Sequence, residues 1–443
     1  MAVATLPSER SFRVGLALIT VAGAVWRLGY LFVVKLDDNV MLNDALYYSM
    51  QAGRNSEGDW FRDGLTQLPG AEHGPLTSLY LTPWSALPGD LVRWQRFGTT
   101  LLGIATVAVI GLVGRRLAGS VVGLLAAAIA VVYANLWIND SVIMSESLAC
   151  LLVAIALLVA LRFDTRPTVG QAAALGVLVG LAALARSELA ILAVGFAVLA
   201  WWRSAGHARR AAMPAAVVVG LVVAIVPWSL YNLSRFEEPV LLTTNDGTTL
   251  LGANCDSTYY EDIGGWDLRC LGDLPPVGTV DASVPSLERR DRAVDYITDH
   301  LDRLPIVVVA RVGRLLDLYR LDSLIALDVG EEKAEWAVWA GIVSFWVVAV
   351  MATVGWRTLR RPGPGSGDRA RARWWLAVPI LAVFLTATVF YGAHRIRAPA
   401  EPAIVVLAAT GIVALVERRS SRPPARVEVP EPVAHSGRAD GHA

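Results

Sequence analysis

Lysine is almost absent from this sequence of 443 residues: Lys35 and Lys333 are the only two, so arginine supplies nearly all of the 39 basic residues. Acidic residues also number 39, and the formal net charge at pH 7 is zero. A strongly basic chain would suggest a nucleic-acid partner, and this balance gives no such indication. We therefore expect no nucleic-acid partner, and the positions of the charges carry more information than their sum.

Several motifs of soluble enzymes and nucleotide-driven proteins are also missing. The sequence contains no P-loop, no dinucleotide fingerprint, no internal repeat and no Cys/His cluster with the spacing of a metal site. No serine or cysteine nucleophile motif stands out either. These absences argue against nucleotide-dependent catalysis, a structural zinc site and covalent hydrolysis, and they leave any cofactor unknown.

Long hydrophobic runs dominate what is present. Hydrophobic residues make up 55% of the chain, and several runs exceed what a globular core helix needs. This composition predicts an all-α polytopic membrane protein with about ten transmembrane helices. The expected spans are residues 14–34, 97–117, 120–137, 142–161, 169–185, 189–202, 212–232, 334–356, 374–391 and 399–416.

Two apolar segments need separate interpretation. Residues 14–34 follow basic residues as a signal peptide does, but the run is too long and no clear cleavage site follows, so we expect an uncleaved first span. In 305–321, Arg311, Arg314, Asp317 and Arg320 recur at three- or four-residue intervals. That spacing favours a helix lying in the membrane interface.

The distribution of charge predicts the orientation of the spans. The connections at 115–116, 203–210 and 357–373 are rich in arginine and should face the cytoplasm. Segments 37–74 and 233–303 carry seven and fourteen acidic residues against two and six arginines, and should lie outside. Ten spans with both termini in the cytoplasm place every loop on the side that its charge predicts. This topology indicates a multi-pass protein of the plasma membrane.

The expected organisation is one membrane domain with two external loops. The Pro-rich polar tail lacks the apolar residues of a core and should be disordered. The divisions are 1–36, the N-terminus and first span; 37–90, the first external loop with interfacial helices; 91–232, spans two to seven; 233–321, the second external loop; 322–417, the last three spans; and 418–443, the cytoplasmic tail.

Three cysteines are present. Cys150 lies within a span and is interpreted as a small apolar side chain, whereas Cys255 and Cys270 lie in the second external loop. An oxidising compartment would allow these two to form a disulfide, although two free thiols are the alternative. The closed loop of about 15 residues would contribute roughly 3 kcal/mol to stability.

The stretch 42-LNDALYYSMQAG-53 places an acid beside aromatic residues where the first span ends. Asp44, Tyr47, Tyr48 and Gln51 share one face of the expected helix. Asp44 would act as a general base or help hold a divalent ion, or it would only cap the helix.

Further ionisable residues lie at the outer ends of spans. Glu146 is expected about one turn inside the fourth span, where a carboxylate needs a partner or a wet cavity. His73 begins 73-HGPL-76, in which Pro75 should start a helix. A histidine at this position would contact a phosphate, a metal or only solvent. Arg186 and Glu188 share a very short turn, and a local ion pair is the simplest interpretation.

The segment 393-AHRIRAPAEP-402 forms an external positive cluster of His394, Arg395 and Arg397. Because Ala398 precedes a proline, extended geometry is expected, which would point both arginines to one side. Two guanidinium groups could then clamp a phosphate, the alternative being a lipid-headgroup contact. Acids and bases at one membrane face would suit an enzyme acting on a lipid phosphate.

The chain resembles the class C (GT-C) membrane glycosyltransferases, in the branch of the protein O-mannosyltransferases and lipid A aminoarabinose transferases, and is most similar to actinobacterial family 39-like members. The resemblance extends over nearly the whole membrane region. Its motifs are 43-NDALYY-48, 73-HGPL-76, 144-MSESLA-149, 186-RSE-188, 254-NCDSTYYEDIGGW-266 and 394-HRIRAPAEP-402. Gly74 departs from the His-Pro-Pro of many relatives, which puts the rigidity of that corner in doubt.

The resemblance implies a GT-C type bundle and a function in cell-envelope glycan or glycoconjugate synthesis. The donor would be a polyprenyl-phosphate sugar in the lipid bilayer, and transfer, generally with inversion, would occur on the extracytoplasmic side. The acceptor would be a glycolipid, a polysaccharide or a protein. Some relatives use a divalent metal ion and others do not, so metal dependence stays open.

The same resemblance, together with the residue patterns, assigns roles to individual positions. Asp44 and Glu146 would be the catalytic acids. The phosphate of the donor would contact Arg395, Arg397, His394 and Arg186. The substrates would contact His73, Tyr48, Tyr259, Tyr260 and Trp266, although ordinary loop packing would also explain the last three.

Two other functions are consistent with the hydropathy alone. A secondary transporter would also carry ionisable residues in its spans, but typically near the midplane and within repeats. A non-catalytic scaffold would leave Glu146 and the external arginines without a role. The transferase interpretation therefore depends mainly on the resemblance.

Overall fold

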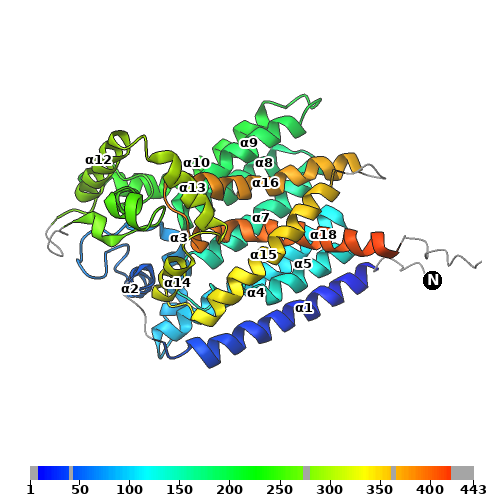
Figure 1. The fold of residues 1–443 in the computed structure, drawn as a ribbon, viewed down its shortest axis with the longest axis horizontal. Coiled ribbons are helices and arrows are strands. Elements are labelled where there is room, and N and C mark those ends of the chain that lie inside the picture. Colours follow the sequence, from blue (N-terminus) through cyan, green and yellow to red (C-terminus); the bar gives the residue numbers. More distant parts are fainter. Residues whose placement is uncertain (1–7, 39–42, 273–279, 361–365, 421–443) are drawn as a thin grey trace, which may run out of the picture.

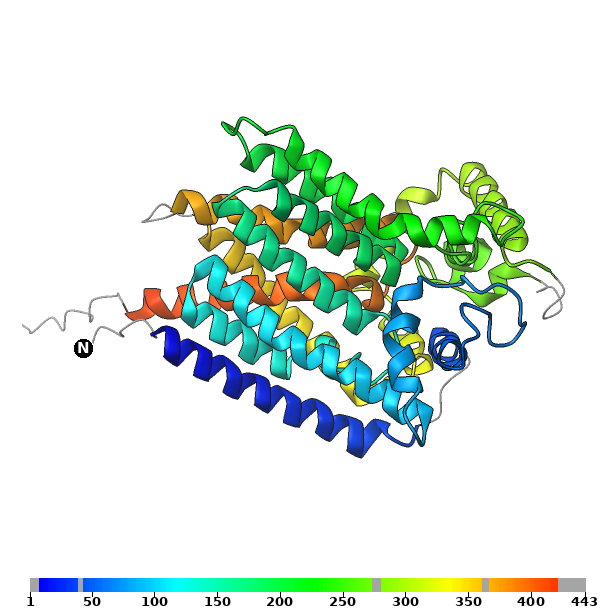
Figure 2. The same cartoon turned by 180° about the vertical axis from the view of Figure 1, so that it is seen from behind.

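The computed structural model describes residues 8–38, 43–272, 280–360 and 366–420. Within these ranges the chain is helical and contains no β-strand, only an isolated bridge between Arg62 and Pro69. Long helices run side by side along the long axis, and shorter helices gather at one end (Figure 1, Figure 2). The predicted all-α polytopic membrane fold is confirmed.

A bundle helix corresponds to each predicted span. The bundle helices are α1 (Glu9–Tyr30), α4 (Leu91–Ala118), α5 (Ser120–Val132), α7 (Glu146–Thr165), α8 (Val169–Ala185), α9 (Leu192–Arg203), α10 (Ala212–Leu233), α15 (Glu335–Thr358), α16 (Ser366–Val389) and α18 (Glu401–Ser420).

Seven segments of the described chain are long and apolar enough to cross a membrane: Glu9–Lys35, Leu91–Ala118, Glu146–Thr165, Ala212–Leu233, Glu335–Thr358, Gly367–Val389 and His394–Arg419. Helices α5 and α8 are apolar but shorter, and α9 is shorter still. A full crossing of the membrane by these three helices stays a prediction.

Helix α18 reaches Ser420, so the tail begins later than expected. Residues 421–443 of the predicted disordered tail lie outside the described residues.

Local sequence sets where the helices begin, and small residues set how closely they pack. Asp90 caps α4 by accepting a hydrogen bond from the Arg93 amide at 3.1 Å. Between α15 and α18, a Cβ on Gly355 would lie 1.9 Å from the Leu407 carbonyl oxygen, and one on Gly411 would lie 2.2 Å from that of Met351. Close backbone approach at small residues is typical of helices packing in a membrane.

Two short helices lie between α1 and α4, in the loop predicted to be external: α2 (Asp44–Ser56) and α3 (Pro75–Ser85). Both begin where the sequence predicted, but the side chain that caps α2 belongs to Asn43, which accepts from the Ala45 amide at 2.8 Å. Asp44 is the first helical residue. Its carboxylate therefore lies at a helix N-terminus without serving as the cap, which leaves it available for other contacts.

The second loop contains α11 (Asp246–Gly252), α12 (Ser283–Asp299) and α13 (Leu304–Leu315), and α14 (Leu321–Gly330) follows it. The basic face predicted for 305–321 is not turned to a membrane surface: Arg311 and Arg314 are buried. Arg311 donates to the carbonyls of Ala253 and Thr388, and α13 ends before the turn at Asp317, where φ is 57°. The predicted helix is confirmed, but its charges serve as internal ties between loop and bundle.

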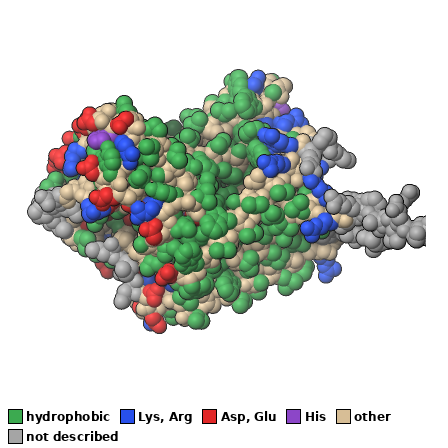
Figure 3. Space-filling view, in the orientation of Figure 1, with side chains coloured by type: hydrophobic (Ala, Val, Ile, Leu, Met, Phe, Trp, Pro, Cys, Tyr) green, Lys and Arg blue, Asp and Glu red, His purple; other side chains and the backbone are tan. Residues whose placement is uncertain are grey.

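Charged side chains mark the two ends of the molecule differently (Figure 3). On the face shown, acidic residues gather at the end that carries α2, α12 and α14, and Lys and Arg dominate the end where the N-terminus lies. Hydrophobic side chains cover the region between them. This pattern is that of a multi-pass membrane protein with a basic end and a mixed, acid-rich end.

The predicted disulfide joins Cys255 and Cys270, whose Cα atoms are 5.7 Å apart, and it closes the segment that contains Tyr259 and Trp266. Cys150 is free and buried, as expected. The bond ties the end of α11 to the short helical turn at Leu268–Leu271.

Replacing both Cys255 and Cys270 by serine should lower the free energy of unfolding of the second loop by about 3 kcal/mol, because the unfolded loop is no longer constrained. Thermal unfolding in detergent with and without a reducing agent measures this. The wild-type protein should lose stability on reduction and the double variant should not respond. Equal melting of the two proteins under oxidising conditions would contradict the expectation.

Candidate active site

Arg395 is the centre of the candidate site. It belongs to α17 (His394–Arg397), a single helical turn between α16 and α18. Its guanidinium contacts three carboxylates from distant parts of the chain: Nη2 lies 2.6 Å from Asp44 Oδ2, Nη1 2.6 Å from Glu331 Oε1, and Nε 3.1 Å from Glu146 Oε1. Three acids around one cation leave this group anionic unless further cations lie nearby.

Arg186 is one such cation. Its Nη1 donates to Glu146 at 2.6 Å, and its Nε donates to Glu188 at 2.7 Å, which confirms the predicted local ion pair. Glu146 is 1% exposed and is the first residue of α7, whereas one turn inside was predicted. Glu146 holds the two arginines 186 and 395 together, and it does not line the cavity described below.

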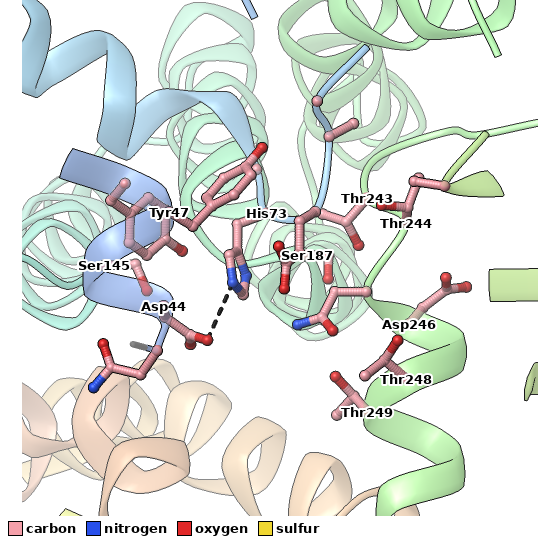
Figure 4. Close-up of a pocket in the computed structure, with 18 of the residues that line it drawn as sticks. Asp44, Tyr47, His73, Ser145, Ser187, Thr243, Thr244, Asp246, Thr248 and Thr249 are labelled. Carbon is pink, nitrogen blue, oxygen red and sulfur yellow. Dashed lines mark ion pairs between the residues drawn. The ribbon is translucent and has the colours of Figure 1, made fainter. Parts of the chain in front are cut away.

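Asp44 and His73 form the other side of the site (Figure 4). His73 Nε2 lies 3.2 Å from Asp44 Oδ1, and the imidazole packs against the rings of Tyr47 and Tyr48. Burial alone would raise the pKa of the Asp44 carboxyl, but the charges of His73 and Arg395 outweigh it and hold that pKa well below its ordinary value. Burial likewise opposes protonation of His73, yet the Asp44 carboxylate raises the pKa of the imidazole above 6.5.

A cavity of about 1000 Å³ opens beside these residues. Asp44, Tyr48, His73, Arg186 and Arg395 all line it. Another part of its lining is apolar and includes Leu327, Phe390 and Ile396, which belong to one packed cluster. A third part comes from the segment 243–249 and Ser187. The cavity thus has the size of a ligand site and combines charged, apolar and hydroxyl-bearing walls.

Arg397 and His394 do not face this cavity. The turn 394–397 is helical and Ala398 also has helical φ and ψ of −46° and −45°, so the extended geometry predicted for this segment is wrong. Arg397 points instead to Glu401 at 2.7 Å and to Asp317 at 3.1 Å, with its guanidinium 3.5 Å from the Phe345 ring centroid. His394 contacts Asp317 and Asp328. Helical rotation separates the two arginines that an extended strand would have paired.

The aromatic residues of the second loop also separate. Trp266 lines the cavity. Tyr259 is fully buried, donates to Asn254 Oδ1 at 2.9 Å and packs edge-to-face on Tyr296, whereas Tyr260 is half exposed and lies under Arg303. Neither tyrosine lines the cavity, so ordinary packing accounts for both.

Sequence reasoning missed the segment 328-DVGEEK-333. Glu331 contacts Arg395, and Lys333 contacts both Glu331 at 3.3 Å and Asp328 at 2.8 Å. These carboxylates raise the pKa of the Lys333 ammonium, although burial opposes protonation. A signal was available, because Lys333 is one of only two lysines and stands immediately before a span.

No group of three or more His, Cys, Asp or Glu residues in the described part of the chain is arranged to hold a metal ion. The carboxylates of the site are instead shared with arginines. The divalent ion that the resemblance left open therefore has no ligand set among these residues.

The helical membrane bundle, with short helices and a charged cavity at one end, has a GT-C glycosyltransferase-like fold. Residues 72–231, just over a third of the chain, match the family model described as dolichyl-phosphate-mannose-protein mannosyltransferase. No curated protein matches the chain. This family match, together with the likeness of the fold to solved structures, confirms the predicted resemblance to the GT-C glycosyltransferases.

Solved structures show the same fold at low sequence identity. The archaeal oligosaccharyltransferase AglB from Archaeoglobus fulgidus, in complex with an inhibitory peptide and a dolichol-phosphate, is 13% identical with a TM-score of 0.56, over 92% of this chain and 50% of that one. The same organism's enzyme tethered to an acceptor peptide is 11% identical with a TM-score of 0.57, over 93% and 50%. This chain spans about half the length of those chains.

A third structure is ArnT from Cupriavidus metallidurans bound to undecaprenyl phosphate. It is 16% identical over 90% of this chain and 78% of that one, with a TM-score of 0.43. That overall similarity is too low to carry an argument about this protein.

Proposed function

We propose that the protein transfers a sugar from a polyprenyl-phosphate donor to an acceptor hydroxyl. The single observation that carries this proposal is the pairing of Asp44 with Arg395 at 2.6 Å on the wall of the large cavity. A transferase of this kind needs a base for the acceptor and a cation for the departing phosphate, and these are the two groups that meet here.

The reaction would be a single displacement. The acceptor oxygen forms a bond to the anomeric carbon while the bond from that carbon to the phosphate oxygen breaks, and the electron pair leaves with the polyprenyl phosphate. Asp44 accepts the proton of the acceptor hydroxyl, and Arg395 and Arg186 stabilise the phosphate. Attack opposite to the leaving group inverts the anomeric configuration.

Donor binding would also free the base. In the described structure Arg395 Nη2 is occupied by Asp44 Oδ2, so a phosphate must compete with that carboxylate for the guanidinium. Once the phosphate takes its place, Asp44 Oδ2 can accept the hydrogen bond of the acceptor hydroxyl. The positive charge on His73 would keep Asp44 ionised until the acceptor arrives.

Glu146 and Glu331 would serve as positioning residues. Glu146 joins Arg186 to Arg395 from behind the cavity, and Glu331 fixes the remaining arm of the Arg395 guanidinium. Burial of the Glu146 carboxylate between two arginines leaves it unsuited to collect a proton from an acceptor. We therefore assign the base to Asp44 alone.

The lipid part of the donor would follow the apolar wall. Ala326, Leu327, Phe390 and Ile396 line the cavity from α14, from the segment after α16 and from α17. The family description names a dolichyl-phosphate sugar, and the AglB structure contains a dolichol-phosphate, which supports a polyprenyl phosphate here. The proposed displacement is the same for a hexose and a pentose.

We further propose that the site faces away from the cytoplasm of a cell membrane. The supporting feature is the charge pattern, with basic side chains at the end where the N-terminus lies and acidic side chains at the cavity end (Figure 3). Both termini would then be cytoplasmic.

Purified protein in detergent, offered a panel of polyprenyl-phosphate sugars and envelope lipids as acceptors, tests the proposal directly. Release of free polyprenyl phosphate that depends on acceptor is the expected result. No release with any donor from a folded protein would contradict the proposal and would favour transport instead.

The His73–Asp44 pair predicts a pH dependence of stability. Because the pKa of His73 is raised, its contribution to stability is complete below 6.5 and is lost as the pH rises through the raised value. The pKa of Asp44 is lowered, so its contribution is complete above 3.8 and is lost as the pH falls through the lowered value. Thermal unfolding between pH 5 and 9 should show an alkaline loss that His73→Gln makes smaller. His207→Gln, in the exposed loop between α9 and α10, is the control and should keep it, and an unchanged profile in His73→Gln would refute the pairing.

A further inference from the structure

The cavity has a wall that the proposed chemistry does not use. The segment 243-TTNDGTT-249 contains four threonines in seven residues and lies across the cavity from Asp44 and His73 (Figure 4). Ser187 lies between the two sides. We call Ser187, Thr243, Thr244, Thr248 and Thr249 the hydroxyl wall.

The hydroxyl wall is held in place from behind. The Thr244 amide donates to the Ala71 carbonyl at 2.8 Å, two residues before His73, and this bond ties the wall to the first external loop. Asp246 accepts hydrogen bonds from Ser286 at 3.1 Å and Arg290 at 2.6 Å, both on α12. At Gly247 the helices approach so closely that a Cβ would lie 1.9 Å from the Ser286 carbonyl oxygen. The wall is therefore a preorganised surface.

Its hydroxyls have bonding capacity left for a ligand. Within the described residues, the side chains of Thr243, Thr249 and Ser187 make no hydrogen bond, and Thr248 accepts one from Arg289 at 3.0 Å. Each hydroxyl is one donor and two acceptors. Sugar hydroxyls have the same dual character, so a row of threonines can pair with a saccharide in either direction.

An aromatic residue of the cavity also suits a saccharide. Trp266 lines the cavity next to the end of α11, and the Asp267 amide donates to the Gly252 carbonyl at 2.9 Å, which fixes that indole beside the wall. An aromatic face suits the C–H face of a sugar ring.

We propose that the hydroxyl wall is the acceptor subsite and that the acceptor is a saccharide, either free or as the glycan of a larger conjugate. The inference rests on the proposed function, because it takes Asp44 as the base that receives the acceptor proton. The donor lipid lies on the apolar wall, the phosphate at Arg395, and the acceptor glycan extends from Asp44 toward 243–249. The acceptor hydroxyl then meets the anomeric carbon between the two walls.

The test uses two substitutions that remove a hydroxyl and keep the shape. Thr243→Val and Thr249→Val, singly and together, are assayed with a polyprenyl-phosphate sugar donor and short mannose-, arabinose- or N-acetylglucosamine-based oligosaccharides as acceptors. Each should raise KM for the oligosaccharide roughly 2- to 10-fold, with kcat and the Kd of the donor unchanged. Thr249→Ser should restore the KM, and Thr353→Val, on the exposed side of α15, should have no effect.

Calorimetric binding of the same oligosaccharides separates the possible failures. The expected result is binding to the wild-type protein that weakens in both valine variants. Stimulation by a serine- and threonine-rich peptide but by no oligosaccharide would overturn the saccharide acceptor and leave the proposed transferase intact. An unchanged KM and Kd in the double variant would overturn the subsite. No release with any donor or acceptor, in folded protein, would overturn the proposed function and this inference with it.

Discussion

Asp44→Asn should reduce sugar transfer by roughly 10²- to 10⁴-fold while the donor still binds, because the amide keeps the shape of the carboxylate and cannot take a proton. The amide would still offer an oxygen to Arg395, so the protein should fold. Single-turnover release of polyprenyl phosphate measures the chemical step, and a binding titration with the donor measures its Kd.

Removal of the negative charge should also tighten donor binding slightly, since the neutral amide competes with the phosphate for Arg395 less strongly than the carboxylate does. Asp59→Asn is the matched control. It removes a carboxylate that lies in the same loop but pairs with Arg54 and Arg62 instead of with the site. Turnover of Asp44→Asn close to that of the wild type would exclude Asp44 as the base, even if the transferase assignment held.

Arg395→Ala should be the most damaging single change to donor binding. It removes charge-assisted hydrogen bonds worth about 1.5 to 3 kcal/mol each, so the Kd for the donor should rise about 100-fold or more. It also leaves Asp44, Glu146 and Glu331 facing one another, and the loss of a buried partner typically costs about 3 to 5 kcal/mol of stability. Donor binding should therefore be measured on protein shown to be folded by thermal unfolding.

Arg395→Lys separates the two effects because it keeps the charge and loses the planar fork. We expect a smaller loss of stability than in Arg395→Ala, together with intermediate donor binding. Arg397→Lys is the informative comparison: this arginine is buried against Asp317 and Glu401, so its substitution should lower stability and leave the donor Kd of the folded protein unchanged. If both lysine variants weakened donor binding equally, Arg397 would have to be a phosphate-binding residue, as predicted from the sequence.

The starts of several helices were predictable because the signals are local. Helix α2 begins at Asp44 and α3 at Pro75, as the sequence indicates, because Asn43 supplies a side-chain cap and proline at N1 loses no hydrogen bond. The disulfide was predictable for a similar reason, since Cys255 and Cys270 lie in one short polar loop. The apolar runs likewise identified the helices of the bundle from length and hydropathy.

The charged contacts of the site were less predictable because they join residues far apart in the sequence. Asp44 and Arg395 are 351 positions apart, and Glu331 was overlooked because nothing local links it to either. Arg311 and Arg314 are a second case in which local sequence was not enough. Their spacing predicted a helix, but it did not show whether their side chains would face the membrane surface or the protein interior. Burial of that face depends on what packs against it.

The sequence by itself determined the helical membrane fold, the positions of most helices, the disulfide and the resemblance that suggested a lipid-phosphate donor. Only the tertiary structure decided which arginine faces the cavity, that Glu146 is held behind it, and that the threonines of 243–249 stand opposite Asp44. Hydropathy and capping act within a few residues of one chain segment. The direction of a side chain such as that of Arg397 is fixed by the neighbouring helices, which the local sequence does not contain.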